Sequence, residues 1–458
     1  MTNVVIGGGI VGMIAALSLK KKFPKEDVML VEKSGSLGGL LNGTTYEKND
    51  LYFDLGTHIF QETGKKELDE LLIGSIPKED LIFYDINSGD YAGGVFFNKF
   101  QQNSHFPDLR NFTDNTFRKE IDHHISELTE VPVIDRLSPL MDVSSKRFGK
   151  KFSNEFIAPI MENMFEHKRD DLSAFALELT GFVRVVLDDF EIWKDKIESP
   201  IYKAIAGIPD QRLLSSDLHH GRRSFYSKKN GSKSLVDGLE KKLIEEGINI
   251  QKNSEIKILD KESLSLAFTD KFGDSKNFNA SKIVIATGVI GASFLLDFNI
   301  ENFPLDKPLP HSIINIELQN ITNSDLCYFY GFDQSTDWYR ITNYRGFSSN
   351  NNDRRISIEL LGNAANNSDN YDSVILNQLR DLEFITSEAI NFVDYVKLPT
   401  GYPSPTVNNM QNLCKIGQEL SKDLPDNIIL GGIGSSEAKF FQNEVVEDLF
   451  ERIISWNF

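Results

Sequence analysis

Cysteine is scarce in this sequence, with only Cys327 and Cys414 among 458 residues. Two cysteines cannot supply a disulfide framework or a cysteine-based metal site. The chain also lacks any apolar run of the ~18 residues that a membrane-spanning helix needs. Met1-Thr2-Asn3 enters a strand pattern at once, without the basic and then apolar segments of a secretory leader. These absences predict a soluble, cytoplasmic protein with no integral membrane segment.

Positive charge is also in short supply. Lysine and arginine number 49 against 67 aspartates and glutamates, and the net charge is −18. So acidic a chain repels a phosphate backbone unless basic residues gather in one patch, and the sequence has no long basic run. The adjacent histidines at 123–124 and 219–220 cannot face a common ion from one helix. We therefore expect neither nucleic-acid binding nor a metal site.

The first 31 residues follow a strand-helix-strand pattern. Val4-Val5-Ile6 is typical of a buried parallel strand, and residues 13–23 predict a helix that ends in basic residues before Pro24. Residues 28–31 predict a second buried strand. This order predicts the start of a doubly wound α/β domain.

Glycines occupy the turn between the first strand and the helix. Gly7 would allow a tight turn, Gly9 the approach of a pyrophosphate, and Gly12 close packing of helix and strand. Glu32 follows the second strand, where a carboxylate binds a ribose diol. The pattern predicts a dinucleotide at the helix N-terminus. The residues expected to contact it are Gly7, Gly9, Ile10, Gly12, Glu32 and Lys33.

A second glycine pair bears on the choice between NAD and FAD. Residues 33–40 read Lys-Ser-Gly-Ser-Leu-Gly-Gly-Leu, which resembles the Glu-(Lys/Arg)-x-x-x-x-Gly-Gly segment of FAD-dependent amine oxidases and mutases. Residues 52–60 resemble the (Phe/Val)-Asp-x-Gly-x-His segment of the same group. The resemblance implies FAD as the cofactor, with Gly38, Gly39 and Leu40 beside its phosphates and ribityl chain. His58 would then lie near the flavin ring.

The nucleotide-binding domain returns late in the chain. Residues 282–288 predict a buried strand that ends in an Ala-Thr-Gly turn, similar to the one this superfamily places beside the cofactor. Further cofactor contacts are implied at Ile256, Thr287, Gly288, Gly432, Gly434 and Ser435. We predict an α/β fold with a Rossmann-type FAD/NAD(P)-binding domain and inserted helical and antiparallel-sheet substrate domains.

The predicted domains interleave along the chain. The FAD-binding domain is discontinuous and comprises residues 1–98, 221–298 and 425–458. A mainly helical cap domain covers residues 99–220, with its strongest helical patterns at 148–165 and 177–196. A β-sheet substrate domain covers residues 299–424.

Two later segments resemble UDP-galactopyranose mutases. Residues 337–344 are similar to their aromatic-Arg-(Ile/Val/Ala)-Thr stretch, and residues 398–407 to their Tyr-Pro-x-Pro-Thr stretch. The resemblance spans nearly the whole chain and implies a reduced flavin that acts as a nucleophile on a nucleotide-linked sugar. Arg340 would pair with the substrate's diphosphate, because its fork can bind two oxygens at once. Tyr402 would reach a phosphate oxygen, and His58 would contact the substrate or tune the flavin.

The resemblance breaks near the C-terminus. Gly431-Gly432-Ile433-Gly434 stands where the mutases carry an arginine, and Ala438 and Phe440 stand where they carry diphosphate-binding tyrosines. Phenylalanine keeps the aromatic surface but cannot form the hydrogen bond of a phenol.

Three functions therefore stay open. The first is a mutase-like isomerase, and the second is an FAD-dependent oxidoreductase of the amine-oxidase, protoporphyrinogen-oxidase or desaturase type. The third is a flavin-binding protein without catalysis. Either enzyme would take a small-molecule substrate, which for the mutase is a nucleotide sugar. The oligomeric state is left undetermined.

Overall fold

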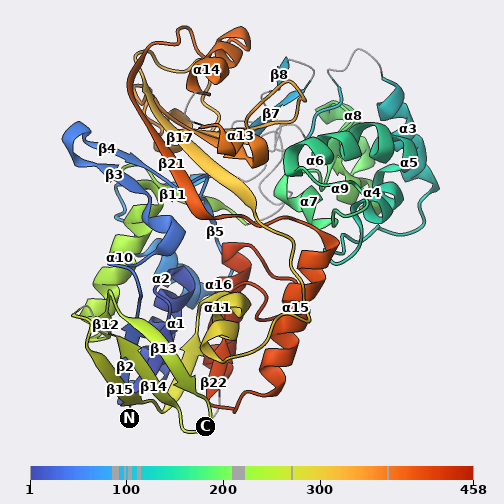
Figure 1. The fold of residues 1–458 in the computed structure, drawn as a ribbon. Coiled ribbons are helices and arrows are strands. Elements are labelled where there is room, and N and C mark those ends of the chain that lie inside the picture. The colour runs from blue at the N-terminus through green and yellow to red at the C-terminus, as the bar shows by residue number, and fades with distance from the viewer. Residues whose placement is uncertain are drawn as a thin grey trace. The chain divides into compact units, whose positions relative to one another are not determined.

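The computed structural model describes residues 2–84, 92–96, 99–101, 106–110, 115–208, 222–269, 272–368 and 371–456. The chain forms two compact units. The first unit comprises Met1–Ile82, Ser224–Leu305 and Gln411–Phe458, and the second comprises Phe83–Arg223 and Asp306–Met410. Three separate stretches of the chain thus build the first unit (Figure 1). The assignment of these stretches to cofactor and substrate domains stays a prediction, and histidines 219 and 220 lie outside the described residues.

A five-stranded sheet forms the centre of the first unit. Its spatial order is β12 (Asn249–Gln251), β2 (Asp27–Val31), β1 (Thr2–Ile6), β16 (Lys282–Ile285) and β22 (Ile428–Leu430). All four neighbouring pairs run parallel. The predicted Rossmann-type α/β fold is therefore confirmed. Strands far apart in sequence meet here because β1 lies between β2 and β16.

Both faces of this sheet are covered, which explains its continuously apolar strands. One face carries Val5, Leu30 and Val284, and α1 (Ile10–Lys22), α10 (Gly231–Glu245) and α16 (Gln442–Ser455) pack against it. The opposite face carries Val4 and Ile283 in a second core. That core includes residues of α11 (Gly288–Leu295), α15 (Val407–Lys422) and the meander of β13 (Glu255–Asp260), β14 (Ser265–Thr269) and β15 (Ser275–Asn279).

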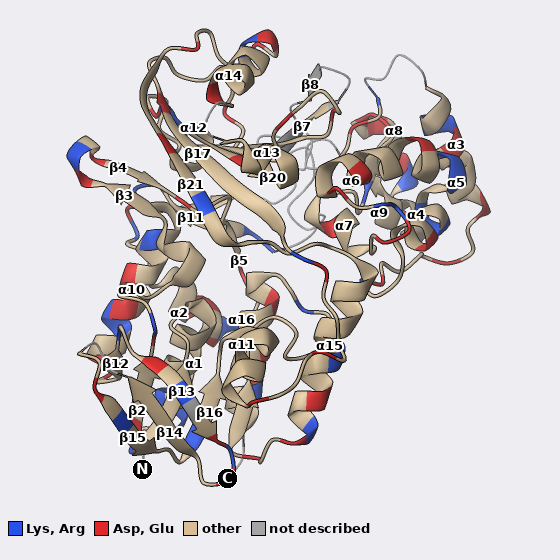
Figure 2. Cartoon of the chain, viewed as in Figure 1, with Lys and Arg blue, Asp and Glu red and all other residues tan. Residues whose placement is uncertain are grey.

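Shorter elements join these layers. They are η1 (Gly39–Asn42), β3 (Thr44–Tyr46), η2 (Glu47–Asn49), β4 (Leu51–Phe53), β5 (Phe60–Gln61), α2 (Lys66–Ile73), β6 (Leu81–Tyr84) and β11 (Ser224–Ser227). Charges of both signs lie along α10, where Lys241 and Glu245 are exposed and 3.8 Å apart (Figure 2). This agrees with a solvated helix face.

The second unit contains a seven-stranded sheet. Its order is β21 (Ile390–Tyr402), β17 (Leu309–Leu318), β20 (Arg355–Leu361), β19 (Arg340–Asn343), β18 (Tyr328–Gly331), β7 (Ala92–Phe96) and β8 (Lys99–Gln101). All neighbours are antiparallel except β18 and β7. Phe329, Ile341 and Ile358 lie on the face that packs against α13 (Gly362–Asn366) and α14 (Asp372–Asp381). Since side chains alternate along a strand, residues 330, 340 and 359 share the opposite face.

Helices make up much of the rest of the second unit. They are α3 (Thr116–Glu127), α4 (Leu140–Phe148), α5 (Lys150–Phe152), the π-helix η3 (Ser153–Ile157), α6 (Ala158–Phe165), α7 (Phe175–Leu179), α8 (Phe190–Lys196), α9 (Pro200–Ile205) and α12 (Tyr344–Ser348). The continuous helical pattern expected at 177–196 is wrong. Gly181 adopts φ +74°, and β9 (Val185–Val186) pairs with β10 (Ala206–Gly207), so the segment is split into two helices.

Two kinds of feature are missing from the described residues. None of the helices in this part of the chain is long and apolar enough to cross a membrane. The same residues contain no cluster of three or more histidine, cysteine, aspartate or glutamate side chains that could hold a metal ion.

The contact between Gly12 and Gly7 generates a stability prediction. A Cβ at position 12 would lie 1.8 Å from the carbonyl oxygen of Gly7, so helix and strand would have to separate. We expect Gly12→Ala to lower the free energy of unfolding by ~1–3 kcal/mol, the usual cost of overpacking. Urea unfolding of cofactor-free protein, followed by circular dichroism, measures this.

Gly9→Ala is the matched control. Gly9 has φ −67°, and a Cβ there would meet nothing within 4 Å. The Gly9 variant should unfold like the wild type. Equal unfolding midpoints for both variants would contradict the proposed role of Gly12.

Candidate functional site

Backbone packing holds the loop between β1 and α1. Gly7 adopts φ +102°, and its N–H donates to the carbonyl oxygen of Val31 at 2.9 Å. Gly7 and Gly12 leave no room for side chains, whereas the space in front of Gly9 is open. A pyrophosphate at a helix N-terminus needs a turn that is packed closely at Gly7 and Gly12 and open to solvent at Gly9. The local structure thus fits a dinucleotide.

The carboxylate of Glu32 faces this loop from the end of β2. Its Oε2 accepts a hydrogen bond from the N–H of Gly8 at 2.6 Å. Its Oε1 accepts from the N–H and the hydroxyl of Ser34, at 2.8 and 2.7 Å. Each carboxylate oxygen can accept about two hydrogen bonds, so Oε2 retains capacity for a ribose hydroxyl.

The second glycine pair lies against the first. The N–H of Gly38 donates to the carbonyl oxygen of Gly8 at 2.8 Å, and Gly38 and Gly39 adopt φ +99° and +57°. A Cβ at Gly39 would lie 3.9 Å from the Cα of Gly9, its only neighbour within 4 Å. Gly9 and Gly39 therefore border the same open space, beside which Leu40 is 48% exposed.

Two later turns meet at the same edge of the sheet. The N–H of Gly288 donates to the carbonyl oxygen of Gly431 at 3.1 Å. Gly432 adopts φ +98°, and a Cβ there would lie 2.6 Å from the nitrogen of Gly288. A Cβ at Gly7 would lie 3.1 Å from Cγ2 of Thr287. The carboxyl ends of β1, β16 and β22 thus bring the predicted cofactor residues of three chain stretches together, which is where open α/β sheets bind ligands.

Three predicted cofactor residues have side chains that lie elsewhere. Ile10 and Ile256 are buried in the two separate cores of the first unit. Lys33 is exposed. Only the backbone of Ile10 and Ile256 is therefore available to a cofactor.

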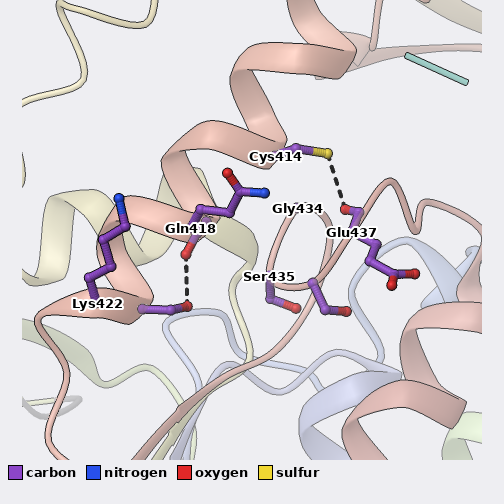
Figure 3. A pocket seen from close by; sticks show the side chains of 9 residues that line it. Cys414, Gln418, Lys422, Gly434, Ser435 and Glu437 are labelled. Carbon is purple, nitrogen blue, oxygen red and sulfur yellow. Dashed lines mark hydrogen bonds between the residues drawn. The ribbon is translucent and has the colours of Figure 1, made fainter. Parts of the chain in front are cut away.

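A pocket of about 430 Å³ lies between α15 and the loop after β22 (Figure 3). Gly434 and Ser435 line it, and the hydroxyl of Ser435 donates to the carbonyl oxygen of Gly432 at 2.7 Å. The thiol of Cys414 donates to the carbonyl oxygen of Glu437 at 3.2 Å. Burial, and then the nearby Glu437, raise the pKa of the Cys414 thiol. A protonated thiol acts here as a donor that holds the loop and not as a nucleophile.

Asp54 is a buried centre of hydrogen bonds before the His58 loop. Its Oδ1 accepts from the hydroxyls of Tyr52 and Ser232 at 2.6 Å each, and from the N–H of Ser232 at 3.0 Å. Its Oδ2 accepts from the hydroxyl of Tyr226. These donors tie β4 to the first turn of α10, where a negative charge suits the helix dipole. His58, four residues on, lies with its Nε2 3.0 Å from the carbonyl oxygen of Leu55.

In the second unit, strand register aligns Tyr330, Arg340 and Glu359 side by side on one face of the sheet. The guanidinium of Arg340 donates to both oxygens of Glu359, at 2.7 and 3.0 Å. The Glu359 side chain is 1% exposed and that of Arg340 is 16% exposed. Burial alone would raise the pKa of Glu359, but Arg340 and the His311 ring hold it well below its usual range. Nε2 of His311 lies 3.4 Å from the second oxygen.

Tyrosines surround this ion pair. The hydroxyls of Tyr339 and Tyr402 are 3.3 Å apart, and the hydroxyls of Tyr330 and Tyr339 donate to the carbonyl oxygen of Leu179 at 3.1 and 3.3 Å. Arg340 lies over the rings of Tyr330 and Tyr339, at 5.7 and 5.3 Å from their centroids. Burial raises the pKa of Tyr402 to about 12, so this hydroxyl is neutral at physiological pH. Arg340 and Tyr402, predicted from separate motifs, thus belong to one cluster.

Two arginines of the second unit, one buried and one half-buried, were not singled out by the sequence analysis. Arg147 is 5% exposed and donates to the carbonyl oxygens of Val183 at 2.8 Å, Pro132 at 2.7 Å and Ala204. Arg184 is half-buried and lies 5.7 Å from the centroid of the Phe106 ring. Burial lowers the pKa of Arg184, and burial with the neighbouring Arg184 charge lowers that of Arg147 to about 10. Neither arginine forms an ion pair within the described part of the chain.

Phe440 lies where the mutase resemblance would place a phenol. It lies two residues before α16, and its N–H donates to Oε2 of Glu444 at 3.1 Å. Its ring packs edge-on against Phe441 at 6.2 Å. Phe440 therefore contributes a backbone hydrogen bond near the start of α16 and an aromatic ring, but no hydroxyl group.

Known proteins share this fold at low sequence identity. A family described as an NAD(P)-binding Rossmann-like domain matches residues 5–72. A reduced UDP-galactopyranose mutase superimposes with a TM-score of 0.70 and 13% identity, covering 99% of this chain and 94% of the mutase. A candidate protoporphyrinogen oxidase from Exiguobacterium sp. 255-15 gives 0.68 and 17%, covering 99% and 98%. A CLA-producing fatty acid isomerase from P. acnes gives 0.62 and 10%, covering 99% and 97%.

No curated protein sequence matches this chain. The structural matches establish a shared fold, in which a Rossmann-type dinucleotide-binding domain opens the chain. All three of these neighbours are enzymes by name. The glycine geometry and the Rossmann match both fit a dinucleotide cofactor.

The open space at Gly9 generates a binding prediction. An alanine methyl group there would enter the space that a pyrophosphate needs, without disturbing the fold. We expect Gly9→Ala protein to bind FAD at least about tenfold more weakly than the wild type (about 1.4 kcal/mol in binding free energy), as measured by titrating the cofactor-free protein with FAD. Full FAD occupancy in this variant would remove Gly9 from the cofactor site.

Proposed function

We propose that this protein is an FAD-dependent enzyme, and that it acts as a mutase-like isomerase on a nucleotide-linked sugar. Bound FAD in its reduced form would supply the nucleophile for such a reaction. The chain's own residues would bind the dinucleotide at the edge formed by β1, β16 and β22. They would hold the sugar substrate with side chains of the second unit.

The observation that carries this proposal is the convergence of two motifs in the second unit. Tyr339 and Arg340 come from the first segment that resembles the mutases, and Tyr402 comes from the second. Their side chains form one cluster, with the hydroxyls of Tyr339 and Tyr402 3.3 Å apart. Phenol groups gathered in this way suit the hydroxyls of a sugar, with which they can both donate and accept hydrogen bonds.

Arg184 supports an anionic substrate. Among the described residues, no carboxylate forms an ion pair with Arg184. A charge that is partly removed from water without a partner raises the free energy of the protein unless a ligand compensates it. It also belongs to the same region as the tyrosine cluster, because the ring of Phe182 packs edge-on against Phe332 at 5.2 Å, and Phe332 stacks on Tyr330 at 5.3 Å. A phosphate would satisfy Arg184 through paired hydrogen bonds.

An FAD-dependent oxidoreductase is the second candidate. The bidentate pairing of Arg340 with Glu359 favours it, because the charge of Arg340 is already compensated. Phe440 and Ala438 add no phenol at the end of the chain. A substrate with less negative charge than a nucleotide diphosphate would then suit the second unit better.

The absorption spectrum of the purified protein tests the cofactor first. A two-banded flavin spectrum that bleaches with dithionite is expected. A protein that stays colourless after incubation with FAD would overturn the flavoenzyme proposal.

Anaerobic turnover then separates the reactions. A mutase should convert UDP-galactopyranose to its furanose form only when the flavin is reduced, with no net consumption of oxidant, as measured by anion-exchange chromatography. An oxidoreductase should instead bleach its oxidised flavin when it meets its substrate without air. A flavin spectrum with neither behaviour would support a binding protein without catalysis.

Arg184→Gln tests the anionic end of the substrate. We expect this variant to bind UDP about 30-fold more weakly than the wild type, because a desolvated arginine–phosphate pair contributes ~2 kcal/mol. Isothermal titration calorimetry on the FAD-loaded protein measures the affinity.

Arg110→Gln is the matched control. Its guanidinium already donates to Asp108, at 3.0 and 2.7 Å, and to Asp189 at 2.7 Å. UDP affinity should be unchanged in this variant. Equal effects of the two substitutions would argue against a specific phosphate contact at Arg184.

A further inference from the structure

Glu359 was not singled out by any sequence motif, yet it sets the charge of the tyrosine cluster. Its carboxylate is 1% exposed and lies beneath the guanidinium of Arg340, which is 16% exposed. Two nitrogens of Arg340 are committed to its two oxygens, at 2.7 and 3.0 Å. Any ligand that approaches Arg340 therefore meets an arginine whose charge is already balanced.

The strand register makes this pairing rigid. Glu359 lies directly opposite Arg340 across β20 and β19, and Arg340 lies directly opposite Tyr330 across β19 and β18. The fork of an arginine fits a carboxylate in one plane, so the pair also fixes the orientation of the guanidinium. The arginine cannot leave Glu359 for another anion without exposing a buried, unpaired carboxylate.

Hydroxyls make up most of the neighbouring polar groups. Tyr330, Tyr339 and Tyr402 are phenols, which can both donate and accept hydrogen bonds. His311 adds a ring that packs edge-on against Tyr402 at 5.6 Å. Such a set of groups suits the hydroxyls of a sugar better than it suits a phosphate.

We propose that Glu359 is a specificity-determining residue that neutralises Arg340, so that this face of the sheet binds an uncharged, hydroxyl-bearing part of the substrate and disfavours a diphosphate. This inference rests on the proposed function, because it places the tyrosine cluster in the substrate site. It differs from the sequence-based expectation that Arg340 itself pairs with the diphosphate.

Glu359→Gln tests the proposal directly. Glutamine keeps the length and one acceptor oxygen but removes the negative charge, which leaves the charge of Arg340 uncompensated. FAD-loaded Glu359→Gln protein should bind UDP at least about tenfold more tightly than the wild type by calorimetry, while its affinity for uridine stays unchanged. An unchanged or weaker affinity for UDP would overturn the proposal.

Glu317→Gln is the control for a general charge effect. Glu317 lies on β17 of the same sheet and pairs with Arg354 at 3.0 Å, where both side chains are partly exposed. Removing this carboxylate should not change UDP binding. A gain as large as that of Glu359→Gln would show a non-specific effect of net charge and would also overturn the proposal.

A double variant covers the case in which Glu359→Gln does not fold. Arg340→Gln with Glu359→Gln removes both charges and keeps hydrogen-bonding groups at both positions. It should bind UDP within about threefold of the wild type, since no net charge is lost. A loss of more than about tenfold would show that Arg340 contributes its charge to the diphosphate, against the proposal.

Failure of this inference can be told from failure of the proposed function. The UDP titrations report only the charge of the site, whereas the anaerobic conversion of UDP-galactopyranose reports the reaction. If the UDP titrations give the expected affinities but UDP-galactopyranose is not converted, the inference about Glu359 stands and the isomerase function is excluded. If UDP-galactopyranose is converted but the Glu359→Gln variant binds UDP no more tightly than the wild type, the isomerase function stands and the inference about Glu359 is overturned.

Discussion

The close approach of α1 to the end of β1 is the constraint on which the cofactor site depends. The carbonyl of Gly7 occupies the space that a side chain at Gly12 would need, so the helix begins almost in contact with the sheet. This contact points the helix N-terminus at the edge where β16 and β22 also end. Gly38 and Gly432 can then pack against that edge through their backbones. A bulkier turn at any of these places would separate the three chain stretches that form the site.

Charge compensation distinguishes the arginines of the second unit. The Arg340 side chain is only 16% exposed and forms an ion pair with one carboxylate, that of Glu359. Arg340 therefore offers oriented hydrogen-bond donors but little net positive charge. Arg184 is half-buried and has no carboxylate partner among the described residues, so its positive charge is not compensated there. In a buried ion pair the mutual attraction offsets part of the desolvation cost, whereas an uncompensated arginine gains that attraction only when it binds an anion. If the second unit holds the substrate as proposed, the placement of acidic residues, more than the number of arginines, would set which substrate charge it accepts.

The sequence was informative where local pattern decides structure. Val4–Ile6, residues 28–31 and the glycines between them predicted the central sheet and its turn, because a parallel strand covered on both faces must be apolar and a tight turn must be glycine-rich. It failed at 177–196, where the short apolar run at 185–187 suits a strand as well as a helix, and where Gly181 adopts a positive φ that ends the helix. Glu359 and Arg184 were invisible for a different reason. Cross-strand register and burial arise from tertiary packing, which no local spacing records.

The shared fold accordingly says less about the reaction than the side chains do. A mutase, an oxidase and a fatty acid isomerase superimpose on this chain over almost its entire length. Backbone packing at the glycines favours dinucleotide binding and does not depend on which substrate is bound. The same packing is therefore compatible with different reactions. In the proposed function, the substrate would be selected by groups on the face of the second sheet that carries Arg340 and Glu359, where one buried carboxylate can change the net charge without moving a strand. On the proposal made here, the decisive contact is the pairing of Glu359 with Arg340, since it would determine whether the arginine of the mutase-like motif still attracts an anion.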